Sequence, residues 1–118
     1  MKYMLLIQQG DTPTPRDPEA WATLSEEEQQ AVFRDYQAVS STPGVTSGVQ
    51  MDDPATSTTV RVQDGRTLTT DGPFVELKEA IGGYLIYEAD DLDAAIELAA
   101  KIPAARLGGA IEVRPVVG

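Results

Sequence analysis

The sequence predicts a single α+β domain in which two helices pack on one face of a mainly antiparallel β-sheet. Three observations lead to this prediction. Short apolar runs with a period of two alternate with two segments that have the period of a helix. Two β-rich runs flank Asp64-Gly65, a dipeptide typical of two-residue hairpin turns. The 118 residues contain no linker, internal repeat or low-complexity run, and they suffice for one domain, residues 1–118, with its own core.

The first half of the chain is expected to form a strand, a helix and a second strand. Met1–Gln8 is apolar on both faces, which favours a central strand. Three prolines between Gly10 and Pro18 predict a loop. Leu24–Ser40 follows as a helix, with a capping box and an apolar stripe of Val32, Phe33, Tyr36 and Val39, before Pro43-Gly44 ends it. Val45–Met51 is a weaker strand.

The second half is expected to form a hairpin, a strand, a helix and a last strand. The hairpin spans Ser57–Thr70, and Gly83–Glu88 is a strand that is apolar on both faces. Asp90 or Asp91 caps a helix that ends before Pro103 and buries a stripe of Leu92, Ala95, Ile96 and Ala99. Ala110–Val116 is the last strand, and Pro115 places its end at a sheet edge.

This order of elements predicts a ferredoxin-like fold, with helices on one face of the sheet only. An apolar sheet face without helices is normally covered by a partner, so we expect a twofold homodimer. Side chains on the strands would then line a cavity between two such faces, among them Tyr3, Arg61, Glu112 and Arg114.

The composition excludes several kinds of site. The chain has no histidine and no cysteine, so it lacks the usual general base, the thiol nucleophile and the normal zinc ligands. No metal site and no cofactor are expected. The formal net charge is −10, from 19 acidic and 9 basic residues. Because such a field repels phosphates, neither a nucleic acid nor an anionic membrane surface is an expected partner.

No segment of the sequence resembles a targeting or membrane signal. The apolar run at the amino terminus is too short for a signal peptide. No window approaches the roughly 18 apolar residues of a transmembrane helix. We therefore expect a soluble, cytoplasmic protein.

The stretch Thr69–Tyr84 concentrates the residues that are candidates for chemistry. Asp71-Gly72-Pro73 is either a rigid turn or a carboxylate held at the mouth of a pocket. Phe74 is either a core anchor or a pocket wall. Glu76, Lys78 and Glu79 form a solvated face, unless burial makes Glu76 or Lys78 a pocket residue. Gly82-Gly83 is expected to allow a bulge in the strand.

Arginine side chains on the strands are further candidates. Arg61 and Arg114 lie opposite apolar neighbours on the predicted strands. Arg114 either pairs with Glu112 or projects into the cavity, where an arginine can bind a carboxylate through two hydrogen bonds. Tyr3 is expected to pack with its hydroxyl at the cavity rim.

The segment Thr69–Glu79, "TTDGPFVELKE", resembles the signature of YCII-related proteins, in particular the DGPF subgroup. Further matching stretches are "MKYMLLI", "TTVRVQDGR", "IGGYLIYEADDLDAAIELA", "IPAARLGG" and "IEVRPV", so the resemblance covers nearly the whole chain. It implies a ferredoxin-like fold that pairs into a dimeric α+β barrel. Some YCII-related proteins carry a His–Asp pair suggested to be catalytic. This chain has no histidine, so only Asp71 could correspond to that pair.

Two main functional hypotheses follow. In the first, the domain binds a small molecule in a cavity formed on dimerisation, lined by Tyr3, Arg61, Gly72, Pro73, Phe74, Glu76, Lys78 and Arg114. If it is an enzyme, Asp71 would act as base in cofactor-free acid–base chemistry. In the second, the acidic surface binds a protein partner in regulation, because the resemblance extends to proteins associated with extracytoplasmic-function sigma factors. A third reading is a stress or housekeeping protein without a discrete site.

Overall fold

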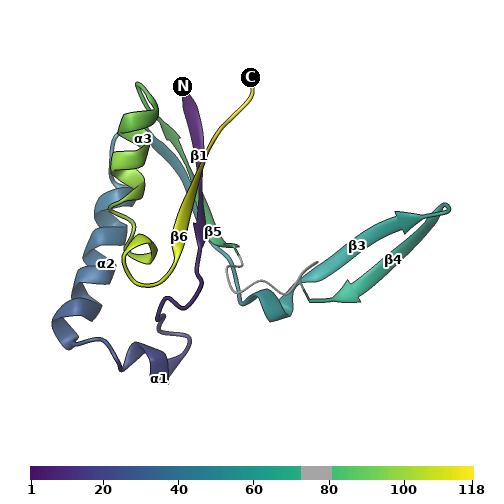
Figure 1. The fold of residues 1–118 in the computed structure, drawn as a ribbon, viewed down its shortest axis with the longest axis horizontal. Helices are drawn as coiled ribbons and strands as arrows, with labels where there is room; N and C mark the ends of the chain where they lie inside the picture. The colour runs from purple at the N-terminus through teal and green to yellow at the C-terminus, as the bar shows by residue number, and fades with distance from the viewer. Residues whose placement is uncertain (73–80) are drawn as a thin grey trace.

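The computed structural model describes residues 1–72 and 81–118 and shows a mixed α+β fold (Figure 1). Most of the described residues form a body of sheet and helices, and one β-hairpin projects from that body. In chain order the elements are β1 (Lys2–Gln8), α1 (Pro18–Trp21), α2 (Glu26–Ser40), β2 (Val45–Gln50), η1 (Pro54–Thr56), β3 (Thr58–Gln63), β4 (Arg66–Asp71), β5 (Ile81–Glu88), α3 (Leu92–Ala99), η2 (Pro103–Ala105) and β6 (Ala110–Pro115).

The body contains a four-stranded antiparallel sheet in the order β2-β5-β1-β6. Helices α2 and α3 both lie on one face of this sheet (Figure 1). This strand order and helix placement are consistent with a ferredoxin-like fold, as the sequence predicts. The strands β1 and β5, which are apolar on both faces, are central, whereas β6 with its terminal Pro115 is at an edge.

The helix starts follow the capping signals in the sequence. Ser25 Oγ accepts a hydrogen bond from Glu28 N at 3.1 Å, and Ser25 N donates to Glu28 Oε1 at 3.1 Å, which completes the capping box of α2. Asp91 caps α3, because its Oδ1 accepts from Ala94 N at 2.9 Å. The short helix α1, capped by Asp17, begins where only a loop was predicted.

The hydrophobic core lies between the sheet and the two long helices, and it corrects both predicted stripes. In α2, Val32 and Val39 are buried, but Phe33 is 58% exposed. In α3 the buried residues are Ala95, Leu98 and Ala99, whereas Leu92 and Ile96 are about half exposed. The helical period identifies the apolar side of a helix, but the row of side chains that meets the sheet depends on the packing angle.

The orientation of β1 differs from the expectation for Tyr3. Tyr3, Leu5 and Ile7 face the helices and are 3%, 0% and 8% exposed. Both faces of β1 are apolar, so alternation alone could not decide which residues face the helices. The opposite side, which we call the helix-free face, is formed by alternate residues of the paired strands, including Met4, Leu6, Tyr84, Ile86, Glu112 and Arg114.

The predicted hairpin is confirmed, and it forms a two-stranded sheet of its own. Asp64 and Gly65 have φ values of 51° and 74°, so both central turn residues lie in the left-handed region that a type I′ turn requires. The strands β3 and β4 project from one end of the body as a ribbon (Figure 1), which we call the arm.

Within residues 1–72 and 81–118, no helix has the length and apolar character needed to cross a membrane.

Candidate functional site

The body contains a cavity of about 340 Å³ between α2 and the sheet. This volume lies in the range of small-molecule sites, which are typically mostly apolar with a few polar groups. Helix α2 forms one wall, and Trp21 of α1 and the loop 12–15 form another. The lining includes Ile7, Gln9, Thr12, Pro13, Pro15, Trp21, Val32, Phe33, Tyr36, Gly48, Gln50, Gly83 and Leu85.

Glycines in neighbouring strands open the floor of this cavity. Gly48 of β2 pairs with Leu85, a buried residue of the helix-covered face. A Cβ atom built on Gly48 would meet no atom within 4 Å, so a side chain here would enter free space. Gly83 lies opposite Ile7, and a Cβ there would come within 2.5 Å of the Val49 carbonyl oxygen. The close approach of β2 and β5 therefore excludes a side chain at Gly83.

The predicted bulge at Gly82-Gly83 is present and positions a polar side chain. The register between β1 and β5 shifts at this point, because Ile7 pairs with Gly83 and Gln8 with Ile81. A Cβ on Gly82 would lie 2.2 Å from Cγ of Gln9. Because Gly82 has no side chain, the side chain of Gln9 can occupy this space beside the cavity.

Polar atoms in the lining have unused hydrogen-bonding capacity. Gln9 Oε1 and Thr12 Oγ1 are both buried, and no described residue forms a hydrogen bond with either atom. A buried polar atom without a partner is costly and calls for an explanation, such as a ligand that supplies one. Both residues line the cavity, which makes them candidate ligand contacts.

Tyr36 is a titratable residue of the described lining. Burial raises the pKa of its phenol above the ordinary value, and the nearby Arg106 guanidinium acts in the opposite direction. Arg106 itself donates a hydrogen bond to Asp35 Oδ2 at 2.8 Å, which ties the η2 segment to α2. The phenol is therefore a neutral hydrogen-bonding group at neutral pH.

An aromatic pair forms part of the cavity lining. The rings of Trp21 and Phe33 lie edge to face, with centroids 5.5 Å apart and planes at 61°. The side-chain amide of Gln29 donates to the Trp21 carbonyl oxygen at 2.9 Å and so joins α1 to α2. These contacts fix the position of Trp21 at the cavity wall.

The described residues among those predicted as a site from the sequence lie apart within one chain. Tyr3 is buried under the helices, and its hydroxyl lies 3.7 Å from Met1 Sδ. Arg61 is in β3 of the arm, and Arg114 is on the helix-free face of β6, where it pairs with Glu112. Pairing with Glu112 is one of the two alternatives for Arg114 that the sequence left open.

Asp71 and Gly72 lie at the root of the arm. Asp71 is the last residue of β4, opposite Thr58, and its side chain has no hydrogen bond or ion pair with any described residue. Gly72 has a φ of 96°, donates from its N–H to the Ser57 carbonyl oxygen at 2.6 Å, and accepts from Thr59 Oγ1 at 2.8 Å. The backbone at Gly72 thus closes the hairpin. Pro73, Phe74, Glu76 and Lys78 lie outside the described residues.

Sequence reasoning missed the cavity between α2 and the sheet. Trp21 and the prolines of its loop hinted at an apolar wall beside the first helix. Gln9, Thr12 and Gly48 gave no signal, because their roles depend on strand register and on the path of a loop. These features of the fold are not encoded in any local pattern.

Comparison with known proteins identifies the family of the chain. A family model described as the YCII-related domain matches residues 1–118. An uncharacterised protein of Rhizobium meliloti (strain 1021) is 33% identical over 121 residues, which cover 98% of this chain and 92% of that relative. The chain therefore belongs to the family of proteins with a YCII-related domain.

Proposed function

We propose that this protein binds a small, largely apolar and uncharged molecule in the cavity between α2 and the sheet. The observation that carries the proposal is a cavity of about 340 Å³ whose described lining contains no Asp, Glu, Lys or Arg. A charged ligand would lose its hydration there without gaining a counter-charge, so a neutral ligand fits best. Gln9 Oε1 and Thr12 Oγ1 are buried, so a ligand N–H or O–H group would reach either atom only after its side chain turns toward the cavity.

The cavity favours binding over acid–base catalysis within one chain. Proton transfer requires a titratable group within hydrogen-bonding reach of the substrate. Asp71 lies on the arm, and the phenol of Tyr36, in the cavity wall, has a raised pKa. If Asp71 acts as a base, its substrate would therefore have to bind outside this cavity, in another one formed between two chains. The DGPF signature around Asp71 supports placing the chain in the DGPF subgroup. It also supports the proposal that Asp71 has an enzymatic role.

We also propose that the protein is a homodimer. The accessible surface is 8037 Å², whereas a folded monomer of this mass exposes about 6,200 Å². The excess of roughly 1,800 Å² lies within the area that each chain of an obligate homodimer buries. A regulatory partner with a basic patch is a weaker alternative, supported by the net charge of −10.

The binding proposal can be tested by filling the cavity at Gly48. Its φ lies outside the left-handed region and its Cβ position is open, so leucine fits without backbone strain. Trp21 is the one tryptophan of the chain, and it lines the cavity. Its fluorescence therefore reports a titration with a neutral aromatic probe, N-phenyl-1-naphthylamine. We expect saturable binding to the parent and an affinity lower by at least about tenfold for Gly48→Leu.

Two controls separate the filled cavity from a damaged fold. Ala100→Leu enlarges an exposed side chain at the end of α3, away from the cavity, and should bind the probe like the parent. Gly48→Leu should unfold at the same urea concentration as the parent or at a higher one. A parent that shows no saturable binding, or a Gly48→Leu variant that binds equally well, would contradict the proposal.

A further inference from the structure

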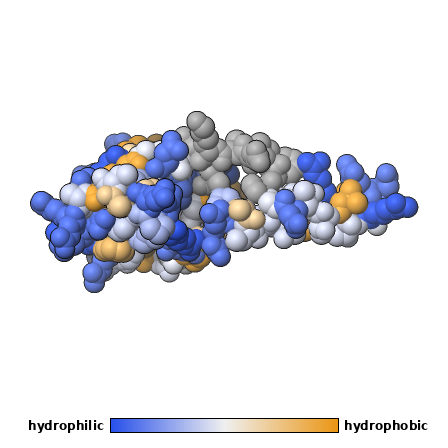
Figure 2. All heavy atoms as spheres, turned by 90° about the horizontal axis from the view of Figure 1, so that it is seen from below, coloured by the Kyte–Doolittle hydropathy of each residue, from blue (hydrophilic) through white to orange (hydrophobic). Residues whose placement is uncertain are grey.

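We propose that the arm, β3–β4, packs its valine-bearing side on the helix-free face of a second copy of this chain. The inference rests on the proposed homodimer and adds the element and the side chains that form the contact. Figure 2 shows the arm extending from the body, with hydrophobic atoms in orange among hydrophilic ones.

The register of the hairpin sorts its side chains onto two sides. Val60 pairs with Thr69 and Val62 with Thr67. These four residues share one side of the ribbon, which we call the valine face. Val60 and Val62 are 59% and 69% exposed. The opposite side carries Arg61 with Leu68, and Gln63 with Arg66, so the two sides differ clearly in polarity.

The arm lacks the packing that normally stabilises a hairpin. A lone two-stranded ribbon is at best marginally stable in water and needs a further strand, a helix or another apolar surface. None of the residues in the buried core cluster comes from β3 or β4. Among the described residues no further strand pairs with this ribbon, and exposed valines on such a ribbon are typical of an interaction surface.

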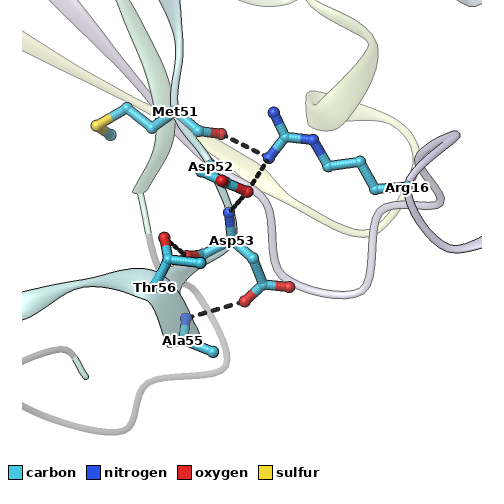
Figure 3. A network of polar contacts seen from close by, with 6 residues as sticks. All are labelled: Arg16, Met51, Asp52, Asp53, Ala55 and Thr56. Carbon is cyan, nitrogen blue, oxygen red and sulfur yellow. Dashed lines mark hydrogen bonds and ion pairs between the residues drawn. The ribbon is translucent and has the colours of Figure 1, made fainter. Parts of the chain in front are cut away.

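Specific contacts tie the segment that leads from β2 into the arm to the body (Figure 3). Arg16 Nη1 donates to the Met51 carbonyl oxygen at 3.0 Å and to Asp52 Oδ1 at 3.2 Å. Asp53 then caps the η1 turn, because its Oδ1 accepts from Ala55 N at 2.9 Å. The segment between β2 and β3 is thus built by specific contacts.

The dimensions of the chain favour a second copy as the occupant. The radius of gyration is 16.1 Å, against about 13.5 Å for a compact domain of this length. The excess exposed area falls within the range that an obligate homodimer buries per chain. Twofold symmetry repeats the arm contact, so the two ribbons of a dimer make two equivalent contacts.

The helix-free face is the surface on the second copy that suits the valine face. Its centre carries Met4, Leu6, Tyr84 and Ile86, all partly exposed, and Val49 at its margin is 45% exposed. No helix among residues 1–72 and 81–118 covers this face in Figure 1. Apolar contact between the two surfaces would remove both from water.

Sedimentation equilibrium of the whole chain tests the inference with a matched pair of variants. Val60→Asp combined with Val62→Asp places two charges on the valine face. Gln63→Asp combined with Thr70→Asp places the same two charges on the opposite side of the same ribbon. We expect a dimeric parent, a dissociation constant raised at least about 100-fold by the valine pair, and a change within about threefold for the control.

Further variants keep the test decisive. If circular dichroism shows that the aspartate pair does not fold, Val60→Thr with Val62→Thr retains β-branched residues and should weaken the dimer about tenfold. Val49→Asp on the partner surface should also weaken it at least about tenfold.

Each contrary outcome identifies the statement that is wrong. A parent that stays monomeric at about 100 μM would overturn the homodimer and the arm contact together. A dimeric parent whose affinity is unchanged in both valine-face variants would overturn the arm contact alone. An effect of the valine variants without any effect of Val49→Asp would show that the arm binds elsewhere on the second copy.

Discussion

The body and the arm are built by different means from neighbouring parts of one sequence. In the body, Leu5 and Ile102 are completely buried, and the sheet and helices enclose a common core. In the arm, nearly every residue from Thr58 to Asp71 is exposed, Val62 among them at 69%. The body is therefore stabilised mainly by burial, whereas the arm depends on its turn, its ladder of hydrogen bonds and any surface it contacts.

This difference shows why apolar residues in a strand do not by themselves indicate a core. The central strand β1 is apolar on both faces, lies between β5 and β6, and buries Tyr3, Leu5 and Ile7 under the helices. The strand β3 alternates valine with polar residues, which is typical of a half-buried strand. No element of the described part of the chain buries Val60 and Val62, so their pattern predicts a surface that is completed by contact with another molecule.

The largest expected effect distinguishes the two regions directly. Ile102→Ala removes a fully buried side chain of the body and should lower the free energy of unfolding by about 2–5 kcal/mol. Leu68→Ala removes a 43% exposed side chain of the arm and should cost less than about 1 kcal/mol. Urea denaturation at low protein concentration measures both. Similar losses for the two variants would show that the arm belongs to the same packed unit as the body.

A smaller effect is expected from Tyr36, a residue of the body that lines the cavity. Burial raises the pKa of Tyr36, so the folded chain keeps this proton at alkaline pH values where the unfolded chain, with a pKa near 10, releases it. The folded state then binds more protons, and the free energy of unfolding falls as pH rises from about 10 through the folded pKa. Tyr36→Phe should remove this part of the alkaline loss.

The measurement for Tyr36 compares two pH values in the parent and the variant. At pH 7 the urea midpoints of the two proteins should differ little. Between pH 7 and about pH 11 the midpoint should fall less in the Phe variant than in the parent. An equal alkaline loss in both proteins would mean that water reaches the phenol of Tyr36 in the folded chain.

Local signals predicted the elements well, and non-local packing limited the rest. Ser25 and Asp91 cap the helices, and Asp64-Gly65 forms the turn, because each acts on a few adjacent backbone groups. The exposure of Phe33 and Ile96 was not predictable, since it depends on how each helix lies on the sheet. The cavity lined by Gln9 and Gly48 depends on register across three strands, which no short window of sequence contains.

The smallest expected effect concerns Asp71, where the arm rejoins the rest of the chain. Its carboxylate contacts no described partner by hydrogen bond or ion pair, and the hairpin is closed at this end by the backbone of Gly72. Asp71→Ala and Asp71→Asn should therefore change the free energy of unfolding by no more than about 0.5 kcal/mol. A carboxylate that the fold does not need is available for a ligand or a second chain. A loss of more than about 1–2 kcal/mol would instead make Asp71 part of a rigid corner, and the case for a functional carboxylate at this position would be lost.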